Sequence, residues 1–161
     1  MITLERMLKH MAWANQHVLN FLVDLPDEAL SAHVVNPDWN VAEIVGHIVS
    51  AADRYGVRLT GIESTDIARP SSMNDVRDLI PLTERFDARL LAAAADEDAK
   101  VLVRHSDGDF ECWRSTILSQ AVHHATEHRA QLASALEAKG FAAPDLDDID
   151  LWAFETCSSP Q

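Results

Sequence analysis

Apolar residues recur every three or four positions through four long segments of the chain, and this spacing constrains the fold most strongly. In the first segment the pattern comprises Leu4, Met7, Leu8, Met11, Ala14, Val18, Phe21, Leu22 and Leu25. A period of three to four residues gathers such positions into one stripe of an amphipathic helix. The pattern therefore predicts a helix from Leu4 to Leu25, which Pro26 should end.

The next two segments predict a second and a third helix. The second follows Asn40, which can cap it with Glu43 as the capping-box partner, and runs to about Thr60. The third is expected over residues 74–95, although Pro81 lies inside it. An internal proline removes one helical hydrogen bond, so a start near Leu82 is the alternative.

A hairpin and a fourth helix complete the predicted fold. Two short β-prone runs, Val101–Arg104 and Phe110–Trp113, flank the Asp-Gly pair of the segment Ser106–Asp109, which is a strong hairpin signal. The fourth helix covers about 115–139 and ends at Gly140, and a last helical turn is expected around residues 151–152. We therefore predict an all-α fold, a four-helix bundle with a small β-hairpin before its fourth helix. Its length of 161 residues fits a single domain over 1–161.

Charge and composition exclude several classes of partner. The chain has 26 acidic and 13 basic residues, a formal charge of −13, and no basic cluster. Nucleic-acid binding relies on a basic surface, so we expect no such partner. No apolar run approaches the roughly 18 residues of a membrane span, and the N-terminus lacks the pattern of a secretory signal. Cys112 and Cys157 have no metal-binding or redox spacing. We expect a cytoplasmic protein.

Three histidines form a candidate metal site. His124 and His128 are four residues apart in the fourth predicted helix, which places their Cβ atoms roughly 5–6 Å apart on one face. His47 lies in the second predicted helix. If the two helices pack side by side, three neutral imidazoles converge and leave a coordination position open, as in catalytic metal sites. A lone histidine on an apolar face is usually a hydrogen-bonded structural residue, and we interpret the others in that way: His10, His17, His33, His105 and His123.

Two motifs carry a resemblance to a known family. The segment from Trp39 to His47 opens the second predicted helix, and His-Ala-Thr-Glu-His-Arg-Ala-Gln spans 124–131. With the helix and hairpin order, these motifs resemble the DinB-like, damage-inducible family of metal-binding four-helix bundles over residues 3–155. The family usually has glycine where this chain has Ala130, and a small residue is kept. The resemblance implies metal binding by His47, His124 and His128, a homodimer, and a long crossover over 61–72 between the second and third helices.

The resemblance also directs the functional hypothesis. The family includes metal-dependent S-transferases that use a low-molecular-weight thiol, so we expect a divalent metal, zinc or nickel, and transfer of a thiol to a small molecule. We expect Gln131 to orient a ligand and Trp39 to edge a pocket. Residues 124–128 also spell His-x-x-Glu-His, the inverted zinc-protease pattern. An upstream third histidine argues against a protease, but Glu127 stays a possible base. The alternatives are a small metal-dependent hydrolase and a non-catalytic, metal-bearing stress-response or binding protein.

Overall fold

The computed structural model describes residues 3–105 and 107–158. Within them the chain is mostly helical, with helices α1 (Leu4–Leu22), α2 (Val41–Thr60), α3 (Met73–Ala93), α4 (Arg114–Ala138) and α5 (Leu151–Ser158), and strands β1 (Lys100–Val103) and β2 (Phe110–Trp113). Short 3₁₀ helices lie at Asp27–Ser31 and Asp147–Ile149.

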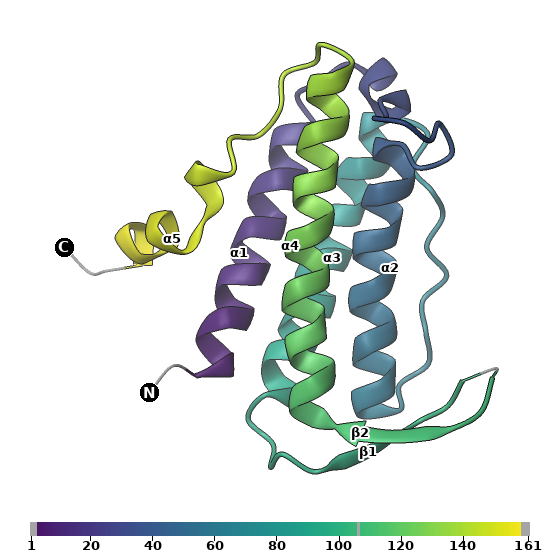
Figure 1. Cartoon of the computed structure of the whole chain (residues 1–161), viewed down its shortest axis with the longest axis vertical. Helices are drawn as coiled ribbons and strands as arrows, with labels where there is room; N and C mark the ends of the chain where they lie inside the picture. The colour runs from purple at the N-terminus through teal and green to yellow at the C-terminus, as the bar shows by residue number, and fades with distance from the viewer. Residues whose placement is uncertain (1–2, 106, 159–161) are drawn as a thin grey trace.

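Helices α1 to α4 form a four-helix bundle (Figure 1), as predicted. Helix α1 packs against α3 and α4, and α2 packs against the same two helices. Helices α2 and α3 run in the same direction because the segment 61–72 returns along the outside of the bundle before α3 begins. The long crossover expected between the second and third helices is therefore present.

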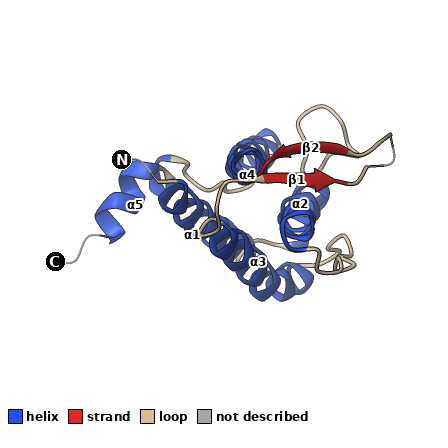
Figure 2. Cartoon of the chain, turned by 90° about the horizontal axis from the view of Figure 1, so that it is seen from below, coloured by secondary structure: helices blue, strands red, loops and turns tan. Residues whose placement is uncertain are grey.

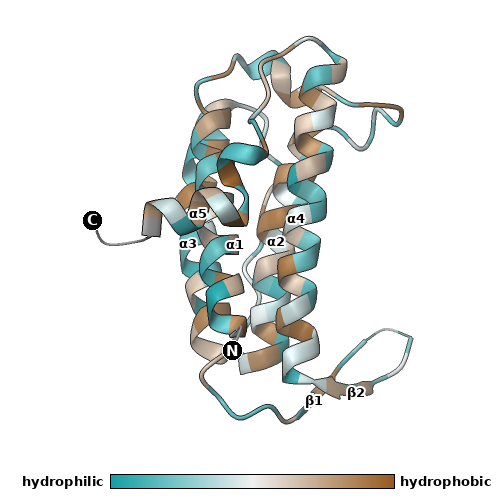
Figure 3. Cartoon of the chain, turned by 60° about the vertical axis from the view of Figure 1, so that its left-hand side comes forward, coloured by the Kyte–Doolittle hydropathy of each residue, from teal (hydrophilic) through white to brown (hydrophobic). Residues whose placement is uncertain are grey.

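The apolar stripes of the helices form the core. In α1 the fully buried members include Leu8, Ala14 and Leu22, and in Figure 3 hydrophobic and hydrophilic residues alternate along each helix. The helix ends at Leu22, before the predicted Leu25. The next turn tightens, because the Leu25 amide bonds the carbonyl of Leu22 three residues back at 2.9 Å.

Helix α3 begins at Met73 and continues through Pro81, so the alternative start at Leu82 is wrong. A capping box fixes the earlier start, since the Ser72 side chain accepts from the Asp75 amide and Asp75 accepts from the Ser72 amide. The Asp27 carboxylate adds a 2.6 Å bond from the Met73 amide. These bonds and core packing on both sides of the proline compensate for the hydrogen bond that Pro81 removes.

The predicted hairpin is present, with β1 one residue earlier than expected. Strands β1 and β2 are antiparallel, with Val103 opposite Phe110 and Lys100 opposite Trp113. They lie across the ends of α2 and α4 (Figure 2). Residue 106 of the predicted turn lies outside the described residues. The expected last helical turn is longer than predicted, since α5 runs from Leu151 to Ser158.

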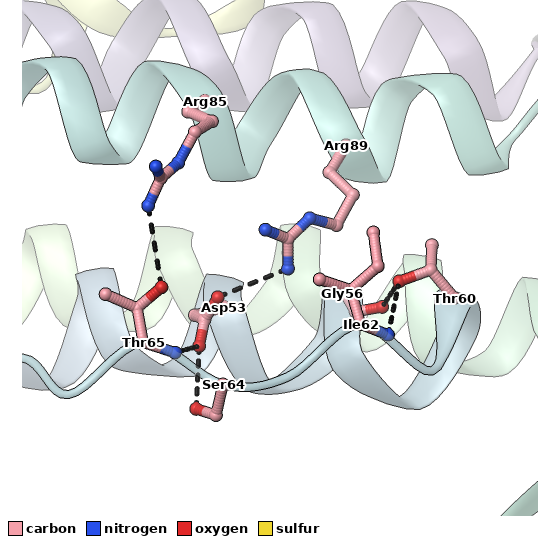
Figure 4. Close-up of polar contacts among 8 residues, drawn as sticks. All are labelled: Asp53, Gly56, Thr60, Ile62, Ser64, Thr65, Arg85 and Arg89. Carbon is pink, nitrogen blue, oxygen red and sulfur yellow. Dashed lines mark hydrogen bonds and ion pairs between the residues drawn. The ribbon is translucent and has the colours of Figure 1, made fainter.

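A buried carboxylate anchors the crossover to the bundle (Figure 4). Asp53 of α2 is fully buried, and its Oδ2 accepts from the Ser64 hydroxyl at 2.7 Å and the Thr65 amide at 2.8 Å. Its Oδ1 accepts from the Arg89 guanidinium of α3 at 3.2 Å. Gly56 leaves room for that guanidinium, because a Cβ there would lie 2.7 Å from Arg89 Cδ. The cluster therefore joins α2, α3 and the crossover.

No helix in the described part of the chain combines the length and the apolar character needed to cross a bilayer.

Candidate metal centre

The three predicted histidines come together between α2 and α4. Asn40 caps α2 by accepting a hydrogen bond from the Glu43 amide at 3.1 Å, and His47 lies on the α2 face that packs against α4. The Nε2 atom of His124 lies 2.9 Å from Nε2 of His47 and 3.0 Å from Nε2 of His128. One nitrogen from each ring fits within a span of 4.8 Å. The i, i+4 spacing and the packing of two helices thus produce the predicted convergence.

A hydrogen-bonded chain fixes the orientation of His128. The Trp39 indole, which can only donate, gives its N–H to Gln131 Oε1 at 3.0 Å. The same oxygen lies 2.8 Å from His128 Nδ1, which must therefore carry the proton. In a neutral ring that leaves a lone pair on Nε2, the atom directed at His124. The expected orienting role of Gln131 has this geometric basis.

Burial keeps the neighbouring rings neutral. It lowers the pKa of His124 to about 4, and the positive charges that His128, His47 and Arg54 can bear add to the effect. The pKa of His47 is lowered as well, first by burial and then by His128 and Arg54, against an opposing effect of Glu43. Neutral imidazole is the form that binds metal, so near neutral pH these two rings are in the state that a metal site requires.

The cluster fits a cation. The lone pair of His128 Nε2 faces another imidazole nitrogen at 3.0 Å, and a positive ion between the rings satisfies all three nitrogens together. Within residues 3–105 and 107–158, no Cys, Asp or Glu joins this group. Cys112 lies in β2 and Cys157 in α5. Three histidines without a fourth protein ligand match an open site of the catalytic type, whereas structural zinc sites are closed by a fourth ligand.

Aromatic rings and a groove border the cluster. The Trp39 ring centroid lies 5.2 Å from that of His47 and 5.5 Å from that of His128. Trp39 also lines a groove of about 530 Å³, which adjoins the cluster through Trp39 and Gln131 rather than through the histidines themselves. The groove is lined by Val34, Val35, Asn36, Trp39, Ile44, Glu127, Ala130, Gln131, Ser134 and Ala135. Glu127 is exposed there, and its carboxylate accepts a hydrogen bond from Gln131 Nε2 at 3.5 Å.

Tyr55 of α2 lies beside the site, although the sequence analysis did not single it out. Its ring meets that of His124 edge-on, with centroids 5.7 Å apart. Its position just over two helical turns after His47 was the available signal. The other histidines lie apart from the cluster, and buried His10 bonds the Ile149 carbonyl at 2.9 Å.

Buried Arg129 reaches a buried carboxylate only indirectly. Its guanidinium donates to Asn15 Oδ1 at 2.7 Å and to the Thr126 hydroxyl at 3.0 Å. The Asn15 amide nitrogen in turn donates to Asp87 at 2.9 Å. Asn15 therefore bridges the buried cation and the buried carboxylate.

Comparisons with known proteins agree with this fold. A model of the DinB family matches residues 1–155. The protein DinB of Bacillus subtilis (strain 168) is 21% identical over 164 residues, which cover 94% of this chain and 94% of that protein. The crystal structure of a DinB-like protein from Bacillus cereus ATCC 10987 superposes with a TM-score of 0.63 at 22% identity, covering 85% of this chain and 91% of that one. The chain belongs to the DinB family.

Proposed function

We propose that the protein binds one divalent metal ion, zinc or nickel, through His47, His124 and His128, and transfers a low-molecular-weight thiol to a small electrophile. The observation that supports this proposal is the convergence of three Nε2 atoms, with 2.9 and 3.0 Å contacts, without a fourth protein ligand among the described residues. Three neutral ligands do not offset the charge of a divalent cation. When bound, such an ion lowers the pKa of a coordinating thiol or water.

The chain's own residues would perform three tasks in the transfer. The histidines hold the cation, and Trp39 with Gln131 keeps the His128 lone pair directed at it. The groove beside Trp39, with exposed Val34 and Val35, offers an apolar surface for the electrophile. In the reaction the thiol loses its proton to solvent, and its sulfur bonds to the electrophilic carbon. The leaving group departs with the electrons of its broken bond.

The nucleophile in this proposal comes from a separate molecule. Cys112 is half-buried in the hairpin and Cys157 is exposed on α5, and neither belongs to the histidine cluster. A free thiol that enters from solvent meets no competing protein sulfur at the site. This favours a low-molecular-weight thiol as the co-substrate.

Hydrolysis is the second candidate, and one observation favours it. The Glu127 side chain lines the same groove as Trp39 and Gln131. An exposed carboxylate there can accept a proton from a water molecule that attacks an ester or amide. The same three histidines would serve this reaction.

Metal content is the first test. Protein purified without a histidine tag should contain about one equivalent of zinc or nickel by elemental analysis. Cobalt is then substituted and glutathione or another small thiol added, which should produce a sulfur-to-cobalt charge-transfer band. Cys112→Ser should leave the band unchanged. A protein that does not retain or take up a divalent metal would refute the site.

Turnover distinguishes the candidate reactions. Assays with an aryl halide and several small thiols test S-transfer, and ester and amide panels test hydrolysis with Glu127→Gln as the variant. Thiol-dependent product that is lost in His128→Ala supports S-transfer. Hydrolysis that is lost in Glu127→Gln instead supports the second candidate. Metal binding without turnover in either assay contradicts both and favours a metal-bearing binding protein.

A further inference from the structure

A buried carboxylate oxygen lacks a hydrogen-bond partner behind the metal centre. Asp87 of α3 is 1% exposed, and its Oδ2 accepts from the Asn15 amide nitrogen at 2.9 Å. Its Oδ1 is buried and meets no donor within the described residues. Burial raises the pKa of Asp87 to about 6, against the effects of Asn15 and Arg129, so near pH 7.5 the group is mostly ionised. An ionised oxygen without a donor is costly in a protein interior.

A small cavity next to Asp87 has room for the missing hydrogen-bond donor. Its volume is about 10 Å³, close to the roughly 10–15 Å³ that one water molecule requires and too small for a larger ligand. The polar residues around it are Asp87, Asn15, Tyr55 and His124. The apolar ones are Met11, Ile48, Ala52, Leu90, Ala121 and Ala125.

His124 connects this cavity with the metal centre. Its Nε2 is directed at the other two histidines, so Nδ1 is the nitrogen that remains for the cavity side of the ring. A metal-binding histidine almost always hydrogen-bonds its second nitrogen to a carboxylate, a carbonyl or a water. Gln131 has that role for His128, whereas no side chain or carbonyl of the described residues hydrogen-bonds Nδ1 of His124.

We infer that the cavity holds a single ordered water that donates to Asp87 Oδ1 and hydrogen-bonds Nδ1 of His124, which makes Asp87 a positioning residue for the metal centre. The water satisfies the carboxylate whether or not a metal is bound. Its effect on metal affinity rests on the proposed function. Asn15 donates to the carboxylate from the other side, and Arg129 in turn donates to Asn15, so the link extends from α4 through α1 and α3 back to the site.

The water is tested on metal-free protein by nuclear Overhauser effects. A long-lived water should show cross-peaks to the methyl groups of Ala121 and Ala125. Ala52→Val should fill the cavity and abolish these cross-peaks while the Asn15–Asp87 bond stays. Absence of a long-lived water in the wild type would overturn the inference, whatever the protein does with metal.

The positioning role is tested by zinc affinity, measured by competition with a chromophoric chelator. Asp87→Leu and Ala52→Val should each weaken zinc binding about 10–100-fold, the usual effect of losing a group that orients a ligand. Asp87→Asn keeps a polar atom toward the cavity, so its zinc affinity should stay within a few-fold of the wild-type value. Thr83→Val is the control, because Thr83 is buried on the same helix, one turn before Asp87, and does not line the cavity.

The two experiments separate the inference from the proposed function. If the wild type shows the water but binds no zinc, the metal proposal fails and the hydration site stands. If Asp87→Leu does not fold, Ala52→Val decides the positioning role. Folded Ala52→Val protein that lacks the water and binds zinc like wild type would overturn that role.

Discussion

Helix α2 contributes to two polar clusters, and they differ in how well donors match acceptors. Toward α3, both oxygens of Asp53 accept hydrogen bonds, from Arg89 on one side and from Ser64 and Thr65 on the other. Toward α4, His47 joins two further imidazoles whose nitrogens approach to 2.9 and 3.0 Å. Neutral imidazole has one donor and one acceptor nitrogen, and His128 already donates through Nδ1 to Gln131.

The difference separates a structural cluster from a candidate binding site. The Asp53 cluster needs no further group, because a fully buried carboxylate is paired and hydrogen-bonded within the protein. The histidine cluster brings three imidazole nitrogens together, and a neutral ring has a single N–H to donate, so a bound cation can satisfy all three lone pairs better than the rings satisfy one another. Converging lone pairs, more than burial or polarity alone, therefore mark the histidine cluster as the candidate functional site in this bundle.

The largest expected effect is on the structural cluster. Asp53→Ala leaves Arg89 without its carboxylate and releases the crossover, so the free energy of unfolding should fall by about 3–5 kcal/mol. Urea denaturation followed by circular dichroism measures the change. Zinc stoichiometry of the folded fraction should stay at about one. A loss below about 1 kcal/mol would show that the crossover is held by other contacts.

The next effect concerns the histidine cluster. His128→Ala should weaken zinc binding more than about 100-fold. Mutation of a group that only hydrogen-bonds a metal ligand already lowers metal affinity about 10–100-fold. The helical signal should persist, because the apolar core is independent of the site. His123→Ala is the matched control, because the His123 side chain is on the same helix, is exposed and lies outside the cluster. Equal zinc affinity in the two variants would refute the assignment of His128.

A smaller loss of zinc affinity should follow when His128 loses the hydrogen bond that fixes its orientation. Gln131→Leu removes the acceptor shared by Trp39 and His128, so zinc affinity should fall about 10–100-fold. Ser134→Ala, in the same groove, should bind zinc normally. Isothermal titration with a competing chelator gives both values. Unchanged affinity in Gln131→Leu would mean that packing alone orients the ring.

The smallest expected effect is a pH dependence of the metal-free protein. The folded-state pKa of His124 is about 4, below the ordinary 6.5, so between these values the unfolded chain binds more protons. Stability from His124 is therefore present above about pH 6.5 and is lost as the pH falls toward 4. Asp87, whose pKa is raised to about 6, acts with the opposite sign. The contribution of His124 is therefore isolated by comparing the unfolding free energy of the wild type with that of His124→Asn.

The measured quantity is the difference in unfolding free energy between wild type and His124→Asn, obtained from urea titrations at several pH values. It should decrease as the pH is lowered from about 6.5 to 4. A constant difference across that range would contradict the lowered pKa of His124.

Much of the site could be predicted because it depends on local spacing. The four-residue interval between His124 and His128 places both on one helix face wherever the helix lies. The positions of Trp39 and Gln131 in these motifs made them candidates, and the structure brings their side chains into contact. Asp53 could not be identified in this way, because an acid followed by Arg54 is typical of a solvated helix face. Only the return of the crossover and the approach of Arg89 show that it is buried.

The sequence by itself determined the helices, the hairpin and the histidine pair, since hydrophobic periodicity, caps and i, i+4 spacing act over a few residues. The tertiary structure decided which polar groups meet. Asn15 and Arg129 are separated by 114 positions, and Asn15 and Asp87 by 72. Burial of such groups depends on how helices pack, which no local pattern encodes. The homodimer and the cytoplasmic location stay predictions, because they depend on surfaces and partners beyond the single chain.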